Sequence, residues 1–176
     1  MNTLPRELTQ ATAKEETPRM SHHIWTLIGA HNSRKESTIR ALTGVARGND
    51  IEVRLANGQT MPLWTQVMAL NVADNAPDAV GWLKTLTSDQ QGAGTHVRLN
   101  LLIGLRLDPE LSPAYAAEAY LEQMAKAGCI LESVVTLGQS TPSFVCALGV
   151  PFASIHDVSG PTNSISAQVR KLWGWE

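Results

Sequence analysis

The chain has 176 residues, of which 43% are apolar and 17% are charged, a composition typical of a globular protein with one hydrophobic core. Fourteen lysines and arginines stand against sixteen aspartates and glutamates, so the net charge of -2 provides no overall basic field for nucleic acid or an anionic membrane. No apolar run is long enough to cross a bilayer, and no apolar block follows the first basic residues as in a secretory signal. We therefore expect a cytoplasmic protein that binds neither nucleic acid nor membrane.

The chain divides into a short polar segment and one organised domain. Residues 1–21 contain two prolines and no sustained hydrophobic period, so we expect a mobile N-terminal arm. Residues 22–176 carry the periodic apolar segments and are predicted to form a single domain. Its first element is a strand over residues 24–28, where nearly every residue is apolar, as in a central strand covered on both faces.

A polar loop and a helix follow this strand, and after them comes a predicted β-hairpin. The helix ends near Gly44, a residue type that favours helix ends. Apolar and polar residues then alternate over 51–55, and a second, more apolar segment covers 61–70. Asn57-Gly58 between them predicts a type I′ turn, in which both central residues have positive φ. We expect the first arm of the hairpin at the edge of a sheet and the second arm inside it.

Helices and strands alternate along the rest of the chain. Apolar periodicity, with proline or glycine at the ends, predicts a helix from Pro77, a strand over 97–107, a helix from Pro113 to Gly128, a strand over 130–137, a strand over 144–150 that can extend through 152–155, and a helix after Pro161. This alternation predicts an α/β fold of three layers, in which helices cover both faces of a mainly parallel sheet with an antiparallel edge hairpin.

The loop between the first strand and the first helix has the layout of a phosphate-binding loop. Such a loop needs Gly, four free positions, Gly, Lys, and then Ser or Thr, placed between a strand and a helix. Gly29 and Lys35 fall in this register. Arg34 replaces the second glycine and Glu36 replaces the hydroxyl residue, although two hydroxyl residues follow directly.

With these elements and this loop, residues 22–176 resemble the P-loop NTPase fold, and the early hairpin is similar to that of its GTPase-like branch. The resemblance implies that backbone N–H groups cradle phosphate oxygens, a lysine contacts the terminal phosphates, and a hydroxyl helps to hold Mg²⁺ with ATP or GTP as cofactor. Carried over by position, the candidate nucleotide-binding residues are Gly29, Asn32, Ser33, Arg34, Lys35, Glu36, Ser37 and Thr38. Asp108, which ends a long apolar strand, is the candidate metal ligand.

Two substitutions in the loop argue against a fully working site. Arg34 places a side chain where the family has none, and so would crowd or close the loop. Glu36 places a carboxylate where a neutral hydroxyl would touch the metal; it could bind Mg²⁺, but it would also face phosphate oxygens of like charge. The chain also lacks the family's Asp-x-x-Gly at 71–74 and its Asn-Lys-x-Asp at 136–139, so guanine specificity has no support.

We therefore predict a degenerate P-loop protein, or pseudo-NTPase, that acts mainly through protein partners or self-assembly and can retain phosphate or nucleotide binding. The alternative is a genuine nucleotide-binding NTPase with an atypical loop, in which Lys35 contacts the phosphates, Ser37 or Thr38 assists, and Asp108 binds Mg²⁺. A small α/β enzyme that uses other loops is a third, less favoured class. Trp175, which follows a glycine, is either an exposed anchor for a partner or folds back onto the domain.

Overall fold

The computed structural model describes residues 21–47, 49–72, 78–90, 99–107 and 116–176. The predicted N-terminal arm, apart from Ser21, lies outside the described residues, as does Asp108. Within the described part of the chain, no helix is both long and apolar enough to span a membrane.

One sheet of six strands organises the described residues, in the spatial order β2-β3-β4-β1-β5-β6. The strands are β1 (His23–Gly29), β2 (Asn49–Arg54), β3 (Thr60–Gln66), β4 (Asn100–Arg106), β5 (Ile130–Leu137) and β6 (Phe152–Ile155). The pairing of β2 with β3 is antiparallel, and the other four pairings are parallel. The predicted α/β class, the mainly parallel sheet and the antiparallel edge hairpin are confirmed.

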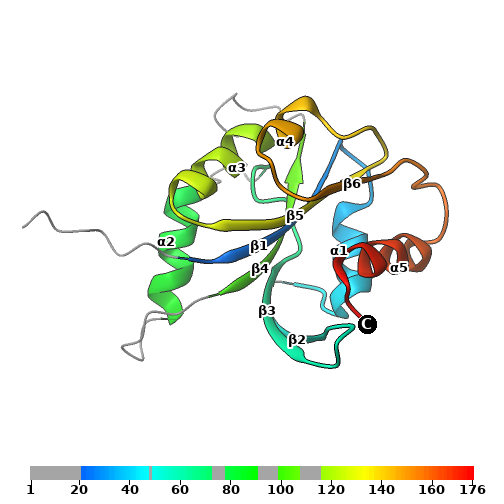
Figure 1. Ribbon diagram of the computed structural model, residues 1–176, viewed down its shortest axis with the longest axis horizontal. Helices are drawn as coiled ribbons and strands as arrows, with labels where there is room; N and C mark the ends of the chain where they lie inside the picture. Colours follow the sequence, from blue (N-terminus) through cyan, green and yellow to red (C-terminus); the bar gives the residue numbers. More distant parts are fainter. Residues whose placement is uncertain (1–20, 48, 73–77, 91–98, 108–115) are drawn as a thin grey trace, which may run out of the picture.

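Helices cover both faces of this sheet, which gives the predicted three layers (Figure 1). The helices are α1 (Lys35–Thr43), α2 (Ala79–Gln90), α3 (Ala117–Lys126), α4 (Ser143–Ala147) and α5 (Thr162–Trp173). Helices α2, α3 and α4 lie on one side of the sheet, and α1 and α5 lie together on the other. Each side therefore has its own hydrophobic core.

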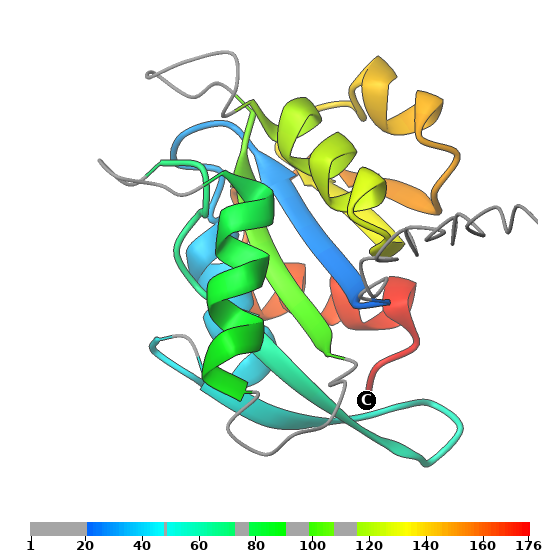
Figure 2. The same cartoon turned by 90° about the vertical axis from the view of Figure 1, so that its left-hand side faces the viewer.

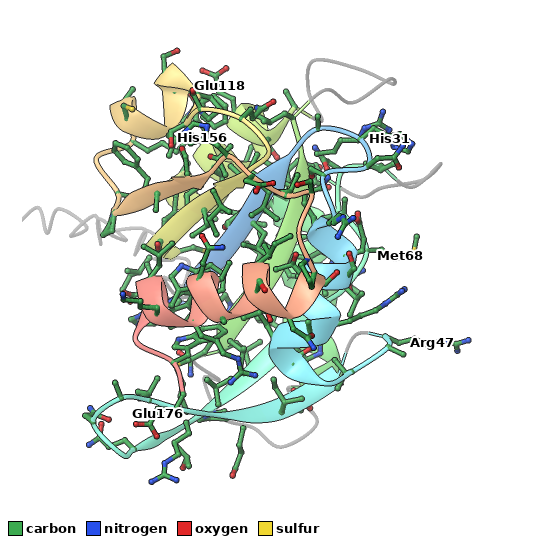
Figure 3. All side chains as sticks on the ribbon, turned by 90° about the vertical axis from the view of Figure 1, so that its right-hand side faces the viewer. His31, Arg47, Met68, Glu118, His156 and Glu176 are labelled. Atoms are coloured by element: carbon green, nitrogen blue, oxygen red, sulfur yellow. The ribbon has the colours of Figure 1, made fainter. Side chains whose placement is uncertain are left out.

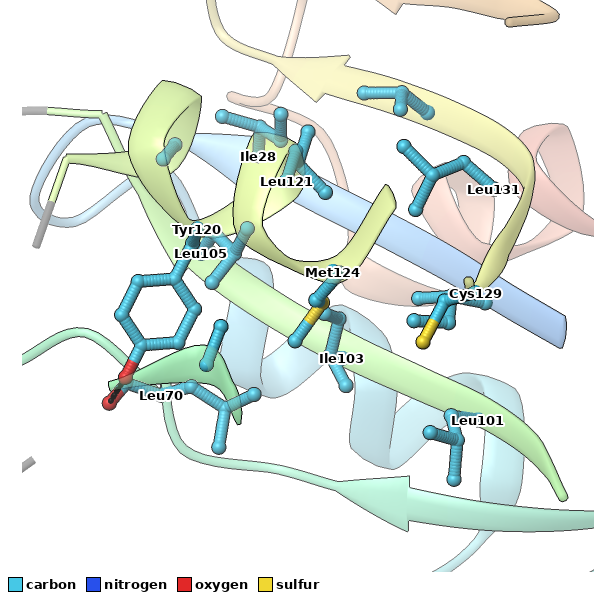
Figure 4. Packing of buried hydrophobic residues seen from close by; sticks show 14 of the residues in the cluster. Ile28, Leu70, Leu101, Ile103, Leu105, Tyr120, Leu121, Met124, Cys129 and Leu131 are labelled. Atoms are coloured by element: carbon cyan, nitrogen blue, oxygen red, sulfur yellow. Dashed lines mark hydrogen bonds between the residues drawn. The ribbon is translucent and has the colours of Figure 1, made fainter. Parts of the chain in front are cut away.

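The alternation of side chains along β4 supplies both cores. Leu101, Ile103 and Leu105 face the helices α2 and α3, whereas Leu102 faces the layer of α1 and α5. Figure 4 shows the first of these cores, where side chains of α3 pack onto β1, β4 and β5. A central strand that is buried on both faces needs apolar residues at every position, which explains the continuous apolar run in this segment.

The hairpin forms as predicted, but its turn is of a different type. Gly58 has a φ of 80°, whereas Asn57 does not have the positive φ that a type I′ turn requires. The Gly58 N–H donates to the Leu55 carbonyl, and Asn57 Oδ1 accepts a hydrogen bond from the Gln59 N–H at 3.0 Å. The Leu55 N–H also donates to the Gln59 carbonyl at 2.8 Å, so the loop contains the three residues 56–58, of which only the glycine is left-handed.

The spatial order of the strands also differs from their order in the sequence. Strand β3 pairs with β4, and β4 in turn pairs with β1, so the hairpin is not adjacent to the strand that leads into the loop. The segment that follows β3 therefore reaches the loop across the end of β4. This placement brings together parts of the chain that lie far apart in the sequence.

Two predictions in the C-terminal third are settled by the fold. The strand predicted over 144–150 is wrong: residues 143–147 form helix α4, and the strand is β6 at 152–155. A short apolar run does not distinguish a strand from a helix, and here Pro142 precedes the helix and Gly149 (φ 66°) ends it. Trp175 folds back: it is 5% exposed and packs against the rings of Trp25 and Trp173.

A buried histidine immediately before β1 affects the stability of the protein. His22 is fully buried, and its Nδ1 accepts a hydrogen bond from the Leu99 N–H at 3.2 Å. Burial, with a smaller contribution from the charge of His23, lowers the pKa of His22 below its usual value. The neighbouring Cys129 stays a neutral thiol, because burial raises its pKa to about 11.

We expect this histidine to make the protein less stable in mild acid. The unfolded chain takes up a proton near pH 6.5 and the folded chain only at lower pH, so stability is complete above that range and falls as the pH drops. The loss from this group therefore grows as the pH falls below 6.5. Urea unfolding at pH 7.5 and 5.5 measures it. His22→Asn, which keeps an acceptor for Leu99, should reduce the pH dependence, and His156→Asn at an exposed site should not.

Candidate functional site

The loop of residues 30–34 lies at the point where the strand order of the sheet reverses, because the strands that follow β1 in the chain lie on one side of it up to β4 and on the other side from β5. Strand β1 has β4 on one side and β5 on the other, and all three run parallel. Gly29, the last residue of β1, is in register with Arg106 of β4 and Leu137 of β5. Figure 2 shows β1 and β4 side by side, with the loop at the ends where both strands stop. In open α/β sheets, ligands bind outside the carboxyl ends of the strands at such a point.

Two residues of this loop hold backbone conformations that ordinary side chains disfavour. Asn32 has a φ of 60° and Arg34 a φ of 64°, and they are the only non-glycine residues with positive φ in the described ranges. Each such residue costs roughly 1 kcal/mol or more, and strain of this kind concentrates at functional sites. Arg34, which stands at the position of the second glycine in the motif, thus adopts a left-handed backbone that glycine adopts without strain.

The Arg34 side chain leaves the loop rather than filling it. It is exposed, and its Nη1 donates a 2.6 Å hydrogen bond to the carbonyl of Gly160, in the connection between β6 and α5. Helix α1 starts directly after Arg34 without a side-chain cap. An uncapped helix start presents N–H groups and the positive end of the helix dipole, both of which favour an anion.

Lys35 is the central side chain of the site. It is only 2% exposed, and its Nζ donates to the carbonyl of Ala30 at 2.7 Å and to Ser33 Oγ at 3.1 Å. Burying an ammonium group is costly unless it is hydrogen-bonded or paired. The loop therefore curls around the lysine and holds its charged end at a fixed place beside the pocket.

Gly29 makes this close curl possible. A Cβ atom at this position would lie 2.3 Å from Ser33 Oγ, 2.8 Å from Ser33 Cβ and 2.9 Å from the Leu137 carbonyl oxygen. These distances are too short for atoms that are not bonded. The first glycine of the motif is thus required for space, since the chain packs against itself on one side and against β5 on the other.

A pocket of about 600 Å³ opens at the loop, within the size range of small-molecule sites. Its lining residues are His31, Asn32, Arg34, Lys35, Glu36, Ser37, Arg40, Met68, Ala69, Val72 and Arg106. Four of these eleven are lysine or arginine, and one is acidic. A concentration of positive charge in one hollow attracts anions even though the whole chain carries a net charge of -2.

Arg106 enters the pocket from the end of β4. It is largely buried, and Asn71 fixes its backbone at two points: Asn71 Nδ2 donates to the Arg106 carbonyl at 2.7 Å, and Asn71 Oδ1 accepts from the Arg106 N–H at 2.8 Å. Asn71 itself is fully buried. The buried amide thus joins the segment after β3 to the end of β4 and sets where the arginine side chain leaves the strand.

The structure brings most of the predicted loop residues to this pocket. Asn32, Arg34, Lys35, Glu36 and Ser37 line it. The other three do not: Gly29 lies beneath the loop, Ser33 is buried against Lys35, and Thr38 is fully buried in α1. The Ser37 hydroxyl donates to the Arg34 carbonyl at 3.0 Å.

Other parts of the site were not predicted from the sequence. The candidate metal ligand, Asp108, lies outside the described residues. Six lining residues were not predicted from the sequence, namely His31, Arg40, Arg106 and the three apolar residues at 68, 69 and 72. A signal was available for Arg106, since a charged residue ends an otherwise apolar strand. The described residues include no group of three or more His, Cys, Asp or Glu arranged to hold a metal ion.

Comparison with protein-family models, with curated proteins and with solved structures finds no match to this chain.

Proposed function

We propose that this protein binds the phosphate groups of a nucleotide, or of a related phosphorylated compound, in the pocket of the 29–38 loop. The observation that carries the proposal is Lys35, which is buried, hydrogen-bonded by the loop and placed in a pocket with three arginines. The resemblance of this loop to that of P-loop NTPases, with Gly29 and Lys35 in register between a strand and a helix, supports the same assignment.

The charges of the pocket match a chain of phosphate groups better than a single one. Lys35 and Arg34 belong to the loop and its helix, Arg40 lies farther along α1, and Arg106 comes from β4. Hydrogen bonds to charged groups contribute about 1.5–3 kcal/mol each, so several cations spread along one hollow favour a polyphosphate. The N–H groups at the start of α1 add to this attraction.

Binding without hydrolysis is the activity we propose, because of Glu36. Its carboxylate lines the pocket next to Lys35, where a working phosphate loop has a hydroxyl that helps to hold Mg²⁺. A carboxylate at this position repels the phosphates and lowers the affinity for a metal–nucleotide complex. A protein that binds a nucleotide without consuming it exerts its effect on another molecule, so the proposal includes a protein partner or a second copy of the chain that recognises the bound form.

Binding can be tested with inorganic triphosphate, ATP and GTP, each with Mg²⁺ and with EDTA. We expect a concentration-dependent rise in the melting temperature, since a ligand present at 100 times its Kd adds about 2.7 kcal/mol of stability. We expect no release of phosphate from ATP or GTP. Steady Mg²⁺-dependent release would favour the NTPase alternative, and no thermal shift with any of the three at millimolar concentration would overturn the proposal.

A further inference from the structure

The pocket has a second wall that differs in character from the first. The loop and α1 supply its polar and charged residues, whereas Met68, Ala69 and Val72 supply an apolar wall from the segment that follows β3. Figure 3 shows Met68 projecting outward beside α1, on the same side of the molecule as His31 of the loop. The apolar wall and the charged loop therefore belong to one hollow that is open to solvent.

The two larger side chains of this wall are unusually exposed. Met68 is 66% exposed and Val72 36% exposed, and they are two of the five large apolar residues found exposed in the described ranges. Neither belongs to the two hydrophobic cores. Single exposed apolar residues are common on protein surfaces. Two on the rim of one charged pocket indicate a ligand with an apolar part.

The fold holds these side chains outward rather than leaving them on a loose segment. Val67 and Leu70, which alternate with them, are buried in opposite cores. The Leu70 N–H donates to the Gly104 carbonyl at 3.1 Å, and its carbonyl accepts a hydrogen bond from the Tyr120 hydroxyl at 3.5 Å, a contact visible in Figure 4. The apolar wall is thus anchored from behind and is already formed before any ligand binds.

We infer that the ligand is a polyphosphate ester whose organic group lies on Met68 and Val72, and that this group is the base of a nucleotide. The inference rests on the proposed function and extends it to substrate class. Methionine suits the flat face of a ring, because its side chain is flexible and its sulfur polarisable. Neither side chain donates or accepts a conventional hydrogen bond to the edge of a base. This apolar wall therefore recognises the presence of a base without selecting which base, and we expect ATP and GTP to bind alike.

An isoprenoid diphosphate has the same chemistry of phosphates joined to an apolar group, so the test must separate it from a nucleotide. Calorimetric titrations with inorganic triphosphate, ATP, GTP, ADP and geranyl diphosphate make this comparison. For the wild type we expect ATP and GTP to bind within about threefold of each other, and each about tenfold more tightly than triphosphate. We expect ADP to bind more tightly than geranyl diphosphate.

Variants of the apolar wall complete the test. Met68→Gln alone, and Met68→Ser with Val72→Ser, should bring the Kd of ATP and GTP close to that of triphosphate while triphosphate binding stays unchanged. Leu172→Ser, at a similarly exposed apolar residue on α5, is the matched control and should change none of these values. Because Met68 is mostly exposed, its replacement should leave the melting temperature of the unliganded protein unchanged.

Several outcomes would overturn this inference and leave phosphate binding intact. Triphosphate could bind as tightly as ATP, the wall variants could bind ATP normally, ATP and GTP could differ by more than tenfold, or geranyl diphosphate could bind more tightly than ADP. Failure of triphosphate and of both nucleotides to bind would instead overturn the proposed function and this inference together.

Discussion

Replacing Lys35 by methionine should reduce the affinity for inorganic triphosphate and ATP by about 10- to 100-fold. This range corresponds to the loss of about 1.5–3 kcal/mol for a hydrogen bond from a charged donor. Methionine fills much of the same buried volume but carries no charge and donates no hydrogen bond. Lys35→Ala should lose as much affinity and should also lower the stability of the unliganded protein, because it leaves a hole beneath the loop.

The measurement for Lys35 is the ligand-induced change and not the melting temperature itself. The lysine bonds to Ala30 and Ser33, so its removal perturbs the loop even without ligand. Lys84→Ala is the matched control, since it removes one positive charge from an exposed position on α2, on the opposite side of the sheet. If Lys35→Met kept the ligand-induced shift of the wild type, the assignment of this pocket to phosphate would be contradicted.

The sequence identified the loop because its signal is local. Gly29 and Lys35 are six residues apart in a single turn between a strand and a helix, and residue type and spacing specify such a turn. Arg34, which was expected to crowd or close the loop, takes a left-handed backbone conformation and directs its guanidinium to Gly160, and the residue also lines the pocket. The left-handed backbone at this position could be expected from the motif. The Gly160 carbonyl, which accepts the hydrogen bond from the Arg34 side chain, could not be expected because it is distant in the sequence.

The rest of the pocket depends on strand order, which periodicity does not encode. Arg106 and Met68 reach the loop because β4 lies between β3 and β1, and a buried parallel strand carries the same apolar pattern at any place inside a sheet. Asn71 shows the same limit: its two bonds to Arg106 join residues that are 35 positions apart. The assignment to the P-loop NTPase fold stays a prediction.

The packing at Gly29 gives the second large expected effect. Gly29→Ala should lower the free energy of unfolding by about 2–3 kcal/mol, the upper part of the usual range for forcing an extra group into a packed site. The added Cβ meets Ser33 Oγ and the Leu137 carbonyl at once, so the loop cannot retreat from one contact without approaching the other. Moving residue 29 also strains the hydrogen bond from the Leu107 N–H to its carbonyl. Urea denaturation measures the loss.

A matched pair of variants separates this clash from the general effect of replacing a glycine. Gly160→Ala adds a Cβ that meets no atom within 4 Å, at a residue without positive φ, and should change the free energy of unfolding by less than about 0.5 kcal/mol. Ser33→Gly combined with Gly29→Ala removes the two side-chain contacts and leaves the 2.9 Å contact with Leu137, so it should recover part of the lost stability. Its affinity for triphosphate should stay below that of the wild type, because Lys35 loses the hydroxyl that orients it. If Gly29→Ala were as stable as the wild type, the loop would not pack as tightly as described. The inference that this packing fixes the position of Lys35 would then be contradicted.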